Sequence, residues 1–263
     1  MKIIDEHVHI GTLGRFDMRP EQVIQSMERY GIAYSLVSSG TAVEYDESQN
    51  PLPEDWPYDQ YSANMETVSF ARAYEGRIGV LPWCRPHTEG FNEAFIRLLD
   101  EGGDLIKGLK FHPYHSRLPV TSPRMEPYFA CAAERNLPVL VHTADDAFSQ
   151  PRFVYEAAKA HPEISFILAH VGLCTDNREA IALIGSLPNL YGDTAWVRPE
   201  SALQLIRQYG AHKLMFGTDN PIDGADTYAH PFYKTYFGEF REWVAPDAYE
   251  RLMHGNAERV YRL

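Results

Sequence analysis

Apolar segments of strand length recur at even spacing along the chain, and helical stretches separate them. Eight segments are expected to form strands, at residues 3–9, 34–38, 78–83, 106–112, 138–142, 165–170, 190–194 and 214–218. Each is rich in Val, Ile, Leu or Phe and lacks strict alternation of apolar and polar residues. That pattern is typical of strands buried on both faces of a parallel sheet.

Helical stretches follow these strands one by one, at residues 20–30, 58–74, 92–100, 124–135, 152–160, 177–184, 200–209 and 248–261. Eight β-α units in 263 residues match an α/β fold of the (β/α)8 TIM-barrel type better than an open doubly wound sheet. We see no repeat and no interdomain linker. The sequence therefore predicts a single barrel domain over residues 1–263.

Two longer insertions interrupt this regular spacing. Residues 40–56 follow the second strand and are rich in Pro, Asn, Asp and Glu, and residues 221–243 follow the eighth strand and carry several aromatic residues. Because both follow strands, we expect both to lie over the C-terminal mouth of the barrel, where active sites of this fold form.

Charge and composition exclude several kinds of partner. The chain has 24 Lys and Arg against 36 Asp and Glu, a net charge of −12, which argues against a nucleic acid or an anionic membrane as partner. No apolar run approaches the roughly 20 residues of a membrane-spanning helix. The first predicted strand begins so early that we expect no signal peptide. Three cysteines do not form a disulfide framework, and we expect a cytoplasmic protein.

Histidines and one aspartate gather at the ends of the predicted strands. His7 and His9 are two residues apart on the first strand, so both imidazoles face the same side, separated by roughly 6.6 Å of strand rise. His142, His170 and Asp219 each follow an apolar strand. Taken singly, each could be a capping or loop residue.

Four strands that place such a residue at the same end of the barrel predict a metal site. Three histidines and one aspartate suit a borderline divalent ion such as zinc, with an open position for water. Such an ion would leave the pocket locally positive, so we expect it to attract a small anionic substrate.

Five segments carry a resemblance to a known family. They are DEHVHIG at 5–11, KGLKFHP at 107–113, LAHVG at 168–172, FGTD at 216–219 and GNAER at 255–259. In this order along the chain they resemble the amidohydrolase superfamily. Within it they resemble the amidohydrolase-related branch of metal-dependent TIM-barrel enzymes, which holds hydrolases, lactonases and decarboxylases of the aminocarboxymuconate-semialdehyde type.

The resemblance implies roles for individual residues. His7, His9, His142 and Asp219 would bind the metal, most simply one zinc ion, with manganese or iron as alternatives. Asp219 would also take a proton from metal-bound water. His170 would either orient that water or hold a second metal. Members of this branch are often dimers, so a homodimer is expected.

Lys110 has three possible roles. It shares one face of the fourth strand with His112, and some superfamily members carry a carbamylated lysine on this strand that bridges two metals. Alternatively it binds a substrate carboxylate beside a single metal, or it merely neutralises nearby carboxylates. Our hypothesis is one metal, with Lys110 and His112 facing the substrate. His115 and Arg198, which follow the fourth and seventh strands, are further candidates for substrate binding.

The leading functional hypothesis is a metal-dependent hydrolase that activates a metal-bound water against a small, carboxylated amide, lactone or ester. The alternative is a non-oxidative metal-dependent decarboxylase that uses the same residues. A phosphoesterase of the histidinol-phosphatase type would continue into a Ser-Asp-Gly segment, and a TatD-like nuclease would prefer a strand-four glutamate and a basic surface. An inactive binding barrel should lack at least one of the inner residues, and none is missing.

Overall fold

The computed structural model describes residues 1–222 and 226–263, and it places a strand at each of the eight expected positions. These strands are β1 (Ile4–Leu13), β3 (Tyr34–Ser39), β4 (Ile78–Val80), β5 (Leu109–Phe111), β6 (Val139–Ala144), β7 (Phe166–Leu173), β8 (Leu190–Asp193) and β9 (Leu214–Met215). Neighbours pair in parallel, in the orders β1-β3-β4 and β5-β6-β7-β8-β9.

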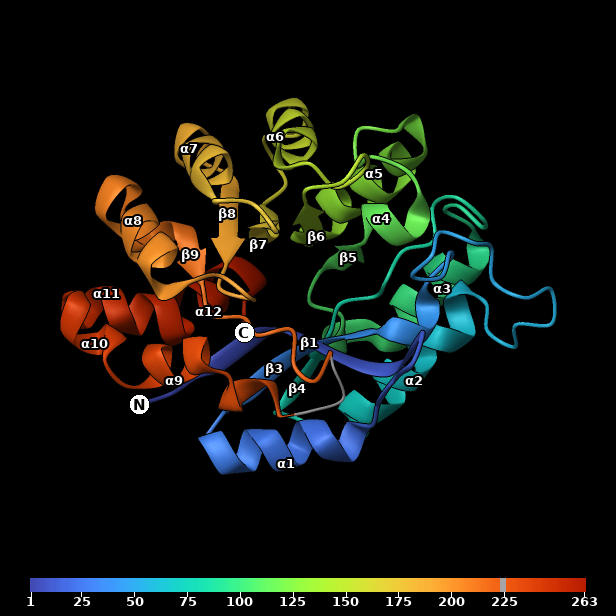
Figure 1. The fold of residues 1–263 in the computed structure, drawn as a ribbon. Coiled ribbons are helices and arrows are strands. Elements are labelled where there is room, and N and C mark those ends of the chain that lie inside the picture. Colours follow the sequence, from blue (N-terminus) through green and yellow to red (C-terminus); the bar gives the residue numbers. More distant parts are fainter. Residues whose placement is uncertain (223–225) are drawn as a thin grey trace.

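Isolated bridges join these two sheets into a barrel. On one side Trp83 pairs with Lys110, and Lys110 N donates to Pro82 O at 2.8 Å. On the other side Val8 pairs with Asn220, and Asp219 N donates to His7 O at 2.7 Å. The predicted (β/α)8 TIM barrel is therefore confirmed (Figure 1).

Helices cover the outside of the strands, as Figure 1 shows. They are α1 (Pro20–Tyr30), α2 (Gln60–Ala73), α3 (Glu93–Gly102), α5 (Glu126–Arg135), α6 (Pro151–Ala160), α7 (Arg178–Ser186) and α8 (Pro199–Tyr209). Each buries one face against the barrel; Val23 and Met27 do so for α1, and Phe95 and Leu98 for α3. A short helix, α4 (Pro113–Ser116), follows β5.

The first strand is longer than predicted and ends in a hairpin that the sequence analysis missed. β1 continues to Leu13, and β2 (Phe16–Met18) pairs with its end in antiparallel fashion. Gly14 has a φ of 55° in the two-residue turn, a left-handed conformation that glycine adopts without strain. The chain reverses direction at this turn, and Leu13 pairs directly with Phe16.

The insertion at 221–243 was expected over the mouth, and that expectation is wrong for its helices; its residues 223–225 lie outside the described part of the chain. α9 (Pro231–Phe237) and α10 (Phe240–Trp243) complete the outer layer instead. The ring of Phe237 stacks on Tyr30 of α1 at 5.7 Å. The gap between the last and first strands needs an apolar cover, and this aromatic segment supplies it.

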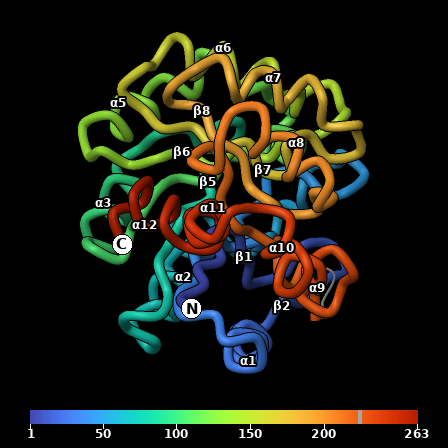
Figure 2. The backbone as a smooth tube through the Cα atoms, turned by 90° about the vertical axis from the view of Figure 1, so that its left-hand side faces the viewer, coloured from blue at the N-terminus to red at the C-terminus, as the bar shows by residue number. Residues whose placement is uncertain are grey.

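The predicted last helix at 248–261 is broken into α11 (Pro246–Glu250), a π-helical turn over Arg251–Gly255 and α12 (Asn256–Tyr261). Tyr261 packs with Leu36, Leu140 and Ile167 from the interior of the barrel. In Figure 2 this red segment lies across the end of the barrel that faces the viewer. It closes the end of the barrel opposite the carboxyl ends of the strands. No helix of the described residues is long and apolar enough to cross a membrane.

Candidate metal centre and active site

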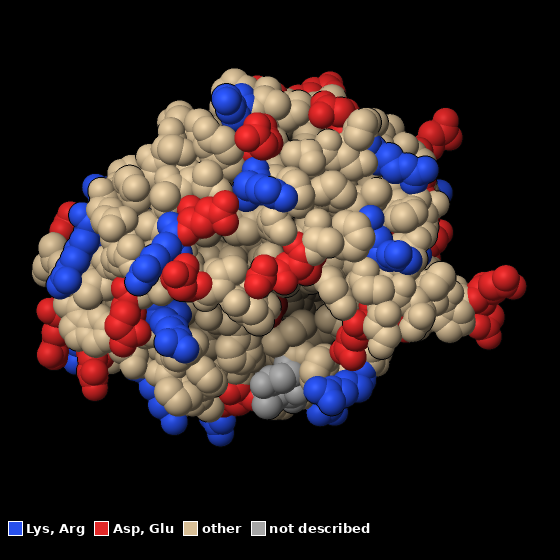
Figure 3. Space-filling model, turned by 45° about the horizontal axis from the view of Figure 1, so that its top comes forward, with Lys and Arg blue, Asp and Glu red and all other residues tan. Residues whose placement is uncertain are grey.

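A cavity of about 310 Å³ opens at the carboxyl ends of the strands. Of the residues that the sequence analysis assigned to metal, catalysis or substrate, all but Arg198 line it. The lining consists of His7, His9, Leu13, Trp83, Lys110, His112, Tyr114, His115, His142, Ala144, Asp146, His170, Leu173, Asp219 and Ile222. Figure 3 shows the surface hollowed near the middle of one face, with acidic side chains next to the hollow.

Three side chains converge at one point of this cavity. The Nε2 atoms of His7 and His9 lie 3.2 Å apart. Asp219 Oδ1 lies 2.9 Å from His9 Nε2 and 3.3 Å from His7 Nε2. Ligand atoms around a tetrahedral ion with bonds of about 2.0–2.1 Å are about 3.3 Å from one another. The three atoms therefore have the spacing that one divalent ion requires.

The backbone at the seam between β9 and β1 holds this group together. Asp219 N donates to His7 O, and His9 N donates to Asn220 O at 2.9 Å. Asp219 has a φ of 68°, in the left-handed region that residues other than glycine seldom adopt. This local turn follows β9 and brings the carboxylate over the two imidazoles, so backbone strain coincides with the site, as it often does in enzymes.

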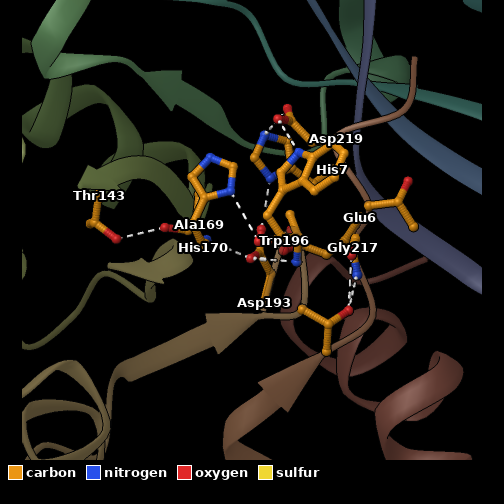
Figure 4. Close-up of polar contacts among 12 residues, drawn as sticks. Glu6, His7, Thr143, Ala169, His170, Asp193, Trp196, Gly217 and Asp219 are labelled. Atoms are coloured by element: carbon orange, nitrogen blue, oxygen red, sulfur yellow. Dashed lines mark hydrogen bonds and ion pairs between the residues drawn. The ribbon is translucent and has the colours of Figure 1, made fainter. Parts of the chain in front are cut away.

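Hydrogen bonds on the far side of each imidazole fix how His7 and His9 are turned. His7 Nδ1 lies 2.7 Å from Asp193 Oδ2, and His9 Nδ1 lies 2.9 Å from Ser38 Oγ (Figure 4 shows the His7 contact). Both rings therefore direct Nε2 into the cavity. Burial, followed by the charge of Lys110, lowers the pKa of His7 well below its ordinary value, so this imidazole is neutral, the form that binds metals.

Asp219 is the carboxylate of the group. Its Oδ2 accepts a hydrogen bond of 3.0 Å from Trp196 Nε1, which leaves Oδ1 for the imidazoles (Figure 4). Burial alone would raise the pKa of this carboxyl, but the neighbouring His7 and His9 together hold it below its ordinary value. Asp219 is therefore ionised and can act as a ligand or as a proton acceptor.

Lys110 lies at the floor of the cavity and is fully buried. Its Nζ donates a hydrogen bond of 2.8 Å to His7 Nε2. Burial lowers its pKa from 10.5 to about 8, against the opposing effect of Asp219, Asp193 and Glu6. A cation thus stands within reach of an anionic group bound in the cavity.

His170 adjoins the first group through Asp193. His170 N donates to Asp193 Oδ1 at 2.7 Å, and the His170 ring lies 5.1 Å from the His7 ring. His7, His170 and Asp193 form a second group whose ligand atoms are close enough to hold a metal ion. His170 and the β-branched Val171 have φ values of 69° and 46°, so the chain is strained here as well.

His142 lies beside these groups and not in them. Among the residues that the structure describes, it belongs to neither set of three converging ligands. Its ring stacks on His112 at 3.8 Å with an angle of 12° and meets the His170 ring edge-on at 4.8 Å. It faces the cavity from the wall opposite β1, where it stays a candidate ligand.

Flat rings form one wall of the cavity. Trp83 stacks on His112 at 5.0 Å with an angle of 8°, and His112 in turn stacks on His142. Burial, followed by the charges of neighbouring histidines, lowers the pKa of His112 and of His142 well below the ordinary value, so both rings are neutral. His115 Nδ1 lies 2.8 Å from Tyr45 O, which turns its ring towards this wall. Uncharged ring surface therefore lines this side of the cavity.

A family model described as amidohydrolase matches residues 4–263. The chain belongs to the amidohydrolase family. The resemblance found in the sequence motifs is thereby confirmed, and the protein is an enzyme by family. A comparison with curated proteins gives no match.

Solved structures similar to this amidohydrolase share its barrel at low sequence identity. A probable 2-pyrone-4,6-dicarboxylic acid hydrolase from Acinetobacter baumannii, with citric acid bound, is 14% identical over 100% of both chains, with a TM-score of 0.66. A 5-carboxyvanillate decarboxylase from Novosphingobium aromaticivorans, complexed with manganese, is 11% identical over 99% of this chain and 96% of that chain, with a TM-score of 0.72. A 2,6-dihydroxybenzoate decarboxylase is 15% identical over 100% of this chain and 99% of that one, with a TM-score of 0.71. At these identities the likeness establishes the fold.

Arg198, expected at the substrate, lies away from the cavity of this amidohydrolase. It is exposed and directly precedes α8. Val197 and Pro199 on either side are buried, so the side chain between them faces solvent. Adjacency to a strand end was too weak a signal to distinguish inward from outward residues.

Asp193 and Trp83 belong to the amidohydrolase site and were missed by the sequence analysis. Asp193 ends β8, so the rule that found Asp219, an acidic residue directly after an apolar strand, could have found it. Trp83 contributes to the flat wall, but nothing in its sequence context distinguishes it from a core tryptophan.

Proposed function

We propose that this amidohydrolase is a metal-dependent hydrolase of a small, carboxylated amide, lactone or ester. The observation that supports this most is the convergence of His7 Nε2, His9 Nε2 and Asp219 Oδ1 within 3.3 Å of one another in the cavity. A buried cation, Lys110, stands next to them.

The donor set fits a single first-row divalent ion. Two imidazole nitrogens and one carboxylate oxygen suit zinc best, with manganese and iron as alternatives, and His142 is the candidate for a further ligand. When bound, such an ion acts as a Lewis acid that polarises a carbonyl oxygen and lowers the pKa of water. A second ion would need the other donor group or a carbamylated Lys110, and we propose one ion.

The protein's own side chains have distinct tasks in this proposal. Asp219 accepts, at Oδ1, the proton that the attacking water loses, while Trp196 holds Oδ2 and so keeps the carboxylate in place. His170 of β7 faces the same point and orients the water through its Nε2. Lys110 binds the substrate carboxylate by a charge-assisted hydrogen bond, with His112 and His115 beside it.

A non-oxidative decarboxylase is the second candidate, and the flat wall formed by Trp83, His112 and His142 favours it. These rings stack on one another at 5.0 and 3.8 Å, and the uncharged surface that they turn to the cavity would lie against a planar aromatic or conjugated acid. In that reaction Lys110 would hold the carboxylate that leaves as CO₂, and Asp219 or His170 would manage the proton that replaces it. Two similar solved structures have such an activity in their names.

One comparison separates the two reactions. The purified enzyme is offered small carboxylated lactones, esters and amides in water enriched in oxygen-18, and aromatic and conjugated acids in a CO₂-release assay. Incorporation of one oxygen-18 atom into an acid product supports hydrolysis. Release of CO₂ without such incorporation supports the decarboxylase. Activity in neither assay, with the metal present, would contradict both.

The partner class, oligomeric state and location that we propose for this enzyme follow from its charge and from the family resemblance. A net charge of −12 fits a small-molecule substrate better than a nucleic acid or membrane partner. The motifs resemble a branch in which dimers are common, so we propose a homodimer, acting in the cytoplasm.

A further inference from the structure

We propose that Asp193 is a positioning residue that fixes the ring tautomers of both His7 and His170, so that each presents an unprotonated Nε2 to the cavity. The inference rests on the proposed metal site, since it concerns how His7 becomes a competent ligand. Asp193 itself lies beneath the cavity and does not line it. Figure 4 shows it between the two histidines.

One carboxylate oxygen determines the tautomer of His7. Asp193 Oδ2 lies 2.7 Å from His7 Nδ1, and both side chains are buried. An ionised carboxylate only accepts hydrogen bonds, so the proton of the neutral ring must be on Nδ1. The lone pair is then on Nε2, the atom that faces His9 and Asp219.

The other oxygen determines the position and tautomer of His170. Asp193 Oδ1 accepts hydrogen bonds from His170 N at 2.7 Å and from Ala195 N at 3.1 Å. Ala195 O in turn lies 3.1 Å from His170 Nδ1. A carbonyl oxygen also only accepts, so His170 carries its proton on Nδ1 as well, and its Nε2 lone pair is free.

This arrangement also holds a strained turn. His170 has a φ of 69°, and the hydrogen bond from its N–H to Asp193 lies at that turn. Because such a backbone persists only where its surroundings over-determine it, the carboxylate supports the main chain of one histidine and the side chain of the other. We expect their orientations to change together when Asp193 changes.

Asp193 is better suited to positioning than to ligating a second ion. It is completely buried, and both of its oxygens already serve three N–H donors at 2.7, 2.7 and 3.1 Å. An ion between His7, His170 and Asp193 would have to displace the donor hydrogen of His7. Carboxylates that orient a metal-binding imidazole through its second nitrogen are a recurrent device in metal sites.

The first test needs no variant. Metal-free protein labelled with nitrogen-15 in histidine is examined by long-range proton–nitrogen NMR, with signals assigned by His7→Gln and His170→Gln. We expect both rings to be neutral and protonated on Nδ1. A proton on Nε2 of either ring in the metal-free protein would overturn the proposal, whether or not the protein binds metal.

The second test is Asp193→Asn. The amide oxygen can still accept from His170 N and Ala195 N, and the amide nitrogen would then donate to His7 Nδ1. That bond requires His7 to move its proton to Nε2, and we expect the same NMR experiment to detect the move. We expect zinc or manganese affinity, measured by titration of the metal alone, to fall by about 10–100-fold.

Ser38→Ala is the matched control, because Ser38 supports the Nδ1 side of His9 in the same way and does not touch His7. It should leave the His7 and His170 signals unchanged. An Asp193→Asn protein that keeps the His7 tautomer and the wild-type metal affinity would refute the inference. If it instead lost one of two bound ions, Asp193 would be a ligand. A wild-type protein that binds no metal but has both Nδ1 protons would contradict the proposed function alone.

Discussion

Replacing Lys110 by Met should make the metal-free protein more stable. The ammonium is fully buried, and burial lowers its pKa from 10.5 to about 8. Since a tenfold change in proton binding corresponds to about 1.4 kcal/mol, keeping the charge in the barrel costs about 3 kcal/mol. Loss of the hydrogen bond to His7 offsets about 1 kcal/mol of that. Methionine has a similar volume, so we expect a net gain of about 2 kcal/mol.

The sign of the pH dependence follows from the lowered pKa of Lys110. Below about pH 8 the lysine is protonated in both the folded and the unfolded chain, and the full penalty is present. Between there and pH 10.5 the folded chain loses the proton first, so the penalty shrinks as the pH rises. The advantage of Lys110→Met should therefore be greatest below pH 8 and should disappear towards pH 10.5.

Urea unfolding of both proteins with a chelator present, at about pH 7 and about pH 10, measures this difference. The same variant should keep its metal content but raise KM for a carboxylated substrate by about 10–100-fold, the value of one charge-assisted hydrogen bond. Lys107→Met is the control, because Lys107 precedes β5 and lies outside the active-site cavity, in a separate cleft with Leu99 and Tyr261. It should change neither KM nor metal content.

Either of two results would refute this reasoning. A Lys110→Met protein less stable than the wild type near pH 7 would mean that the ammonium is not held at a desolvation cost. Loss of one metal equivalent from the variant would mean that Lys110 is a ligand, in its carbamylated form, and not a substrate-binding group.

Three further variants test separate parts of the account. Asp219→Asn removes the proton acceptor and should lower kcat by about 10²–10⁴-fold in a protein whose circular dichroism is unchanged; wild-type kcat would contradict that role. Trp83→Leu removes part of the flat wall and should weaken binding of planar acids about tenfold, with little effect on non-planar ones; equal loss for both kinds would argue against stacking. Asn256 Nδ2 donates hydrogen bonds of 2.7 Å to the carbonyls of Ala211 and Leu214, and Asn256→Ala removes both. The free energy of unfolding, measured in urea, should fall by about 2–4 kcal/mol. A change below about 0.5 kcal/mol would show that water or a shifted backbone replaces the amide.

Strand positions could be predicted because burial on both faces leaves continuous apolar runs in the sequence. Polar residues at the carboxyl ends of these runs were also recognisable as site candidates, and His7, His9 and Asp219 were found that way. Pattern says less about what covers the strands. The segment around Phe237 was interpreted as a mouth insertion because it follows a strand, although its aromatic residues cover the seam beside Tyr30.

Details of the site depend on packing that one sequence does not display. His112 and His142 come from different strands, and only the barrel shows that their rings stack at 3.8 Å. The sequence around Asp193 does not distinguish it from other residues at strand ends, and only the fold places its two oxygens between His7 and His170. Arg198 looked equally suitable, but alternation with buried neighbours turns it to solvent.

Metal stoichiometry tests the central claim most directly. Protein purified without added metal or chelator is analysed by plasma mass spectrometry against its molar concentration. The account predicts about one equivalent of a first-row divalent ion, most simply zinc, at the point where His7, His9 and Asp219 converge. No bound ion would contradict the metal centre, and about two equivalents would contradict the single-ion site with Lys110 free for substrate.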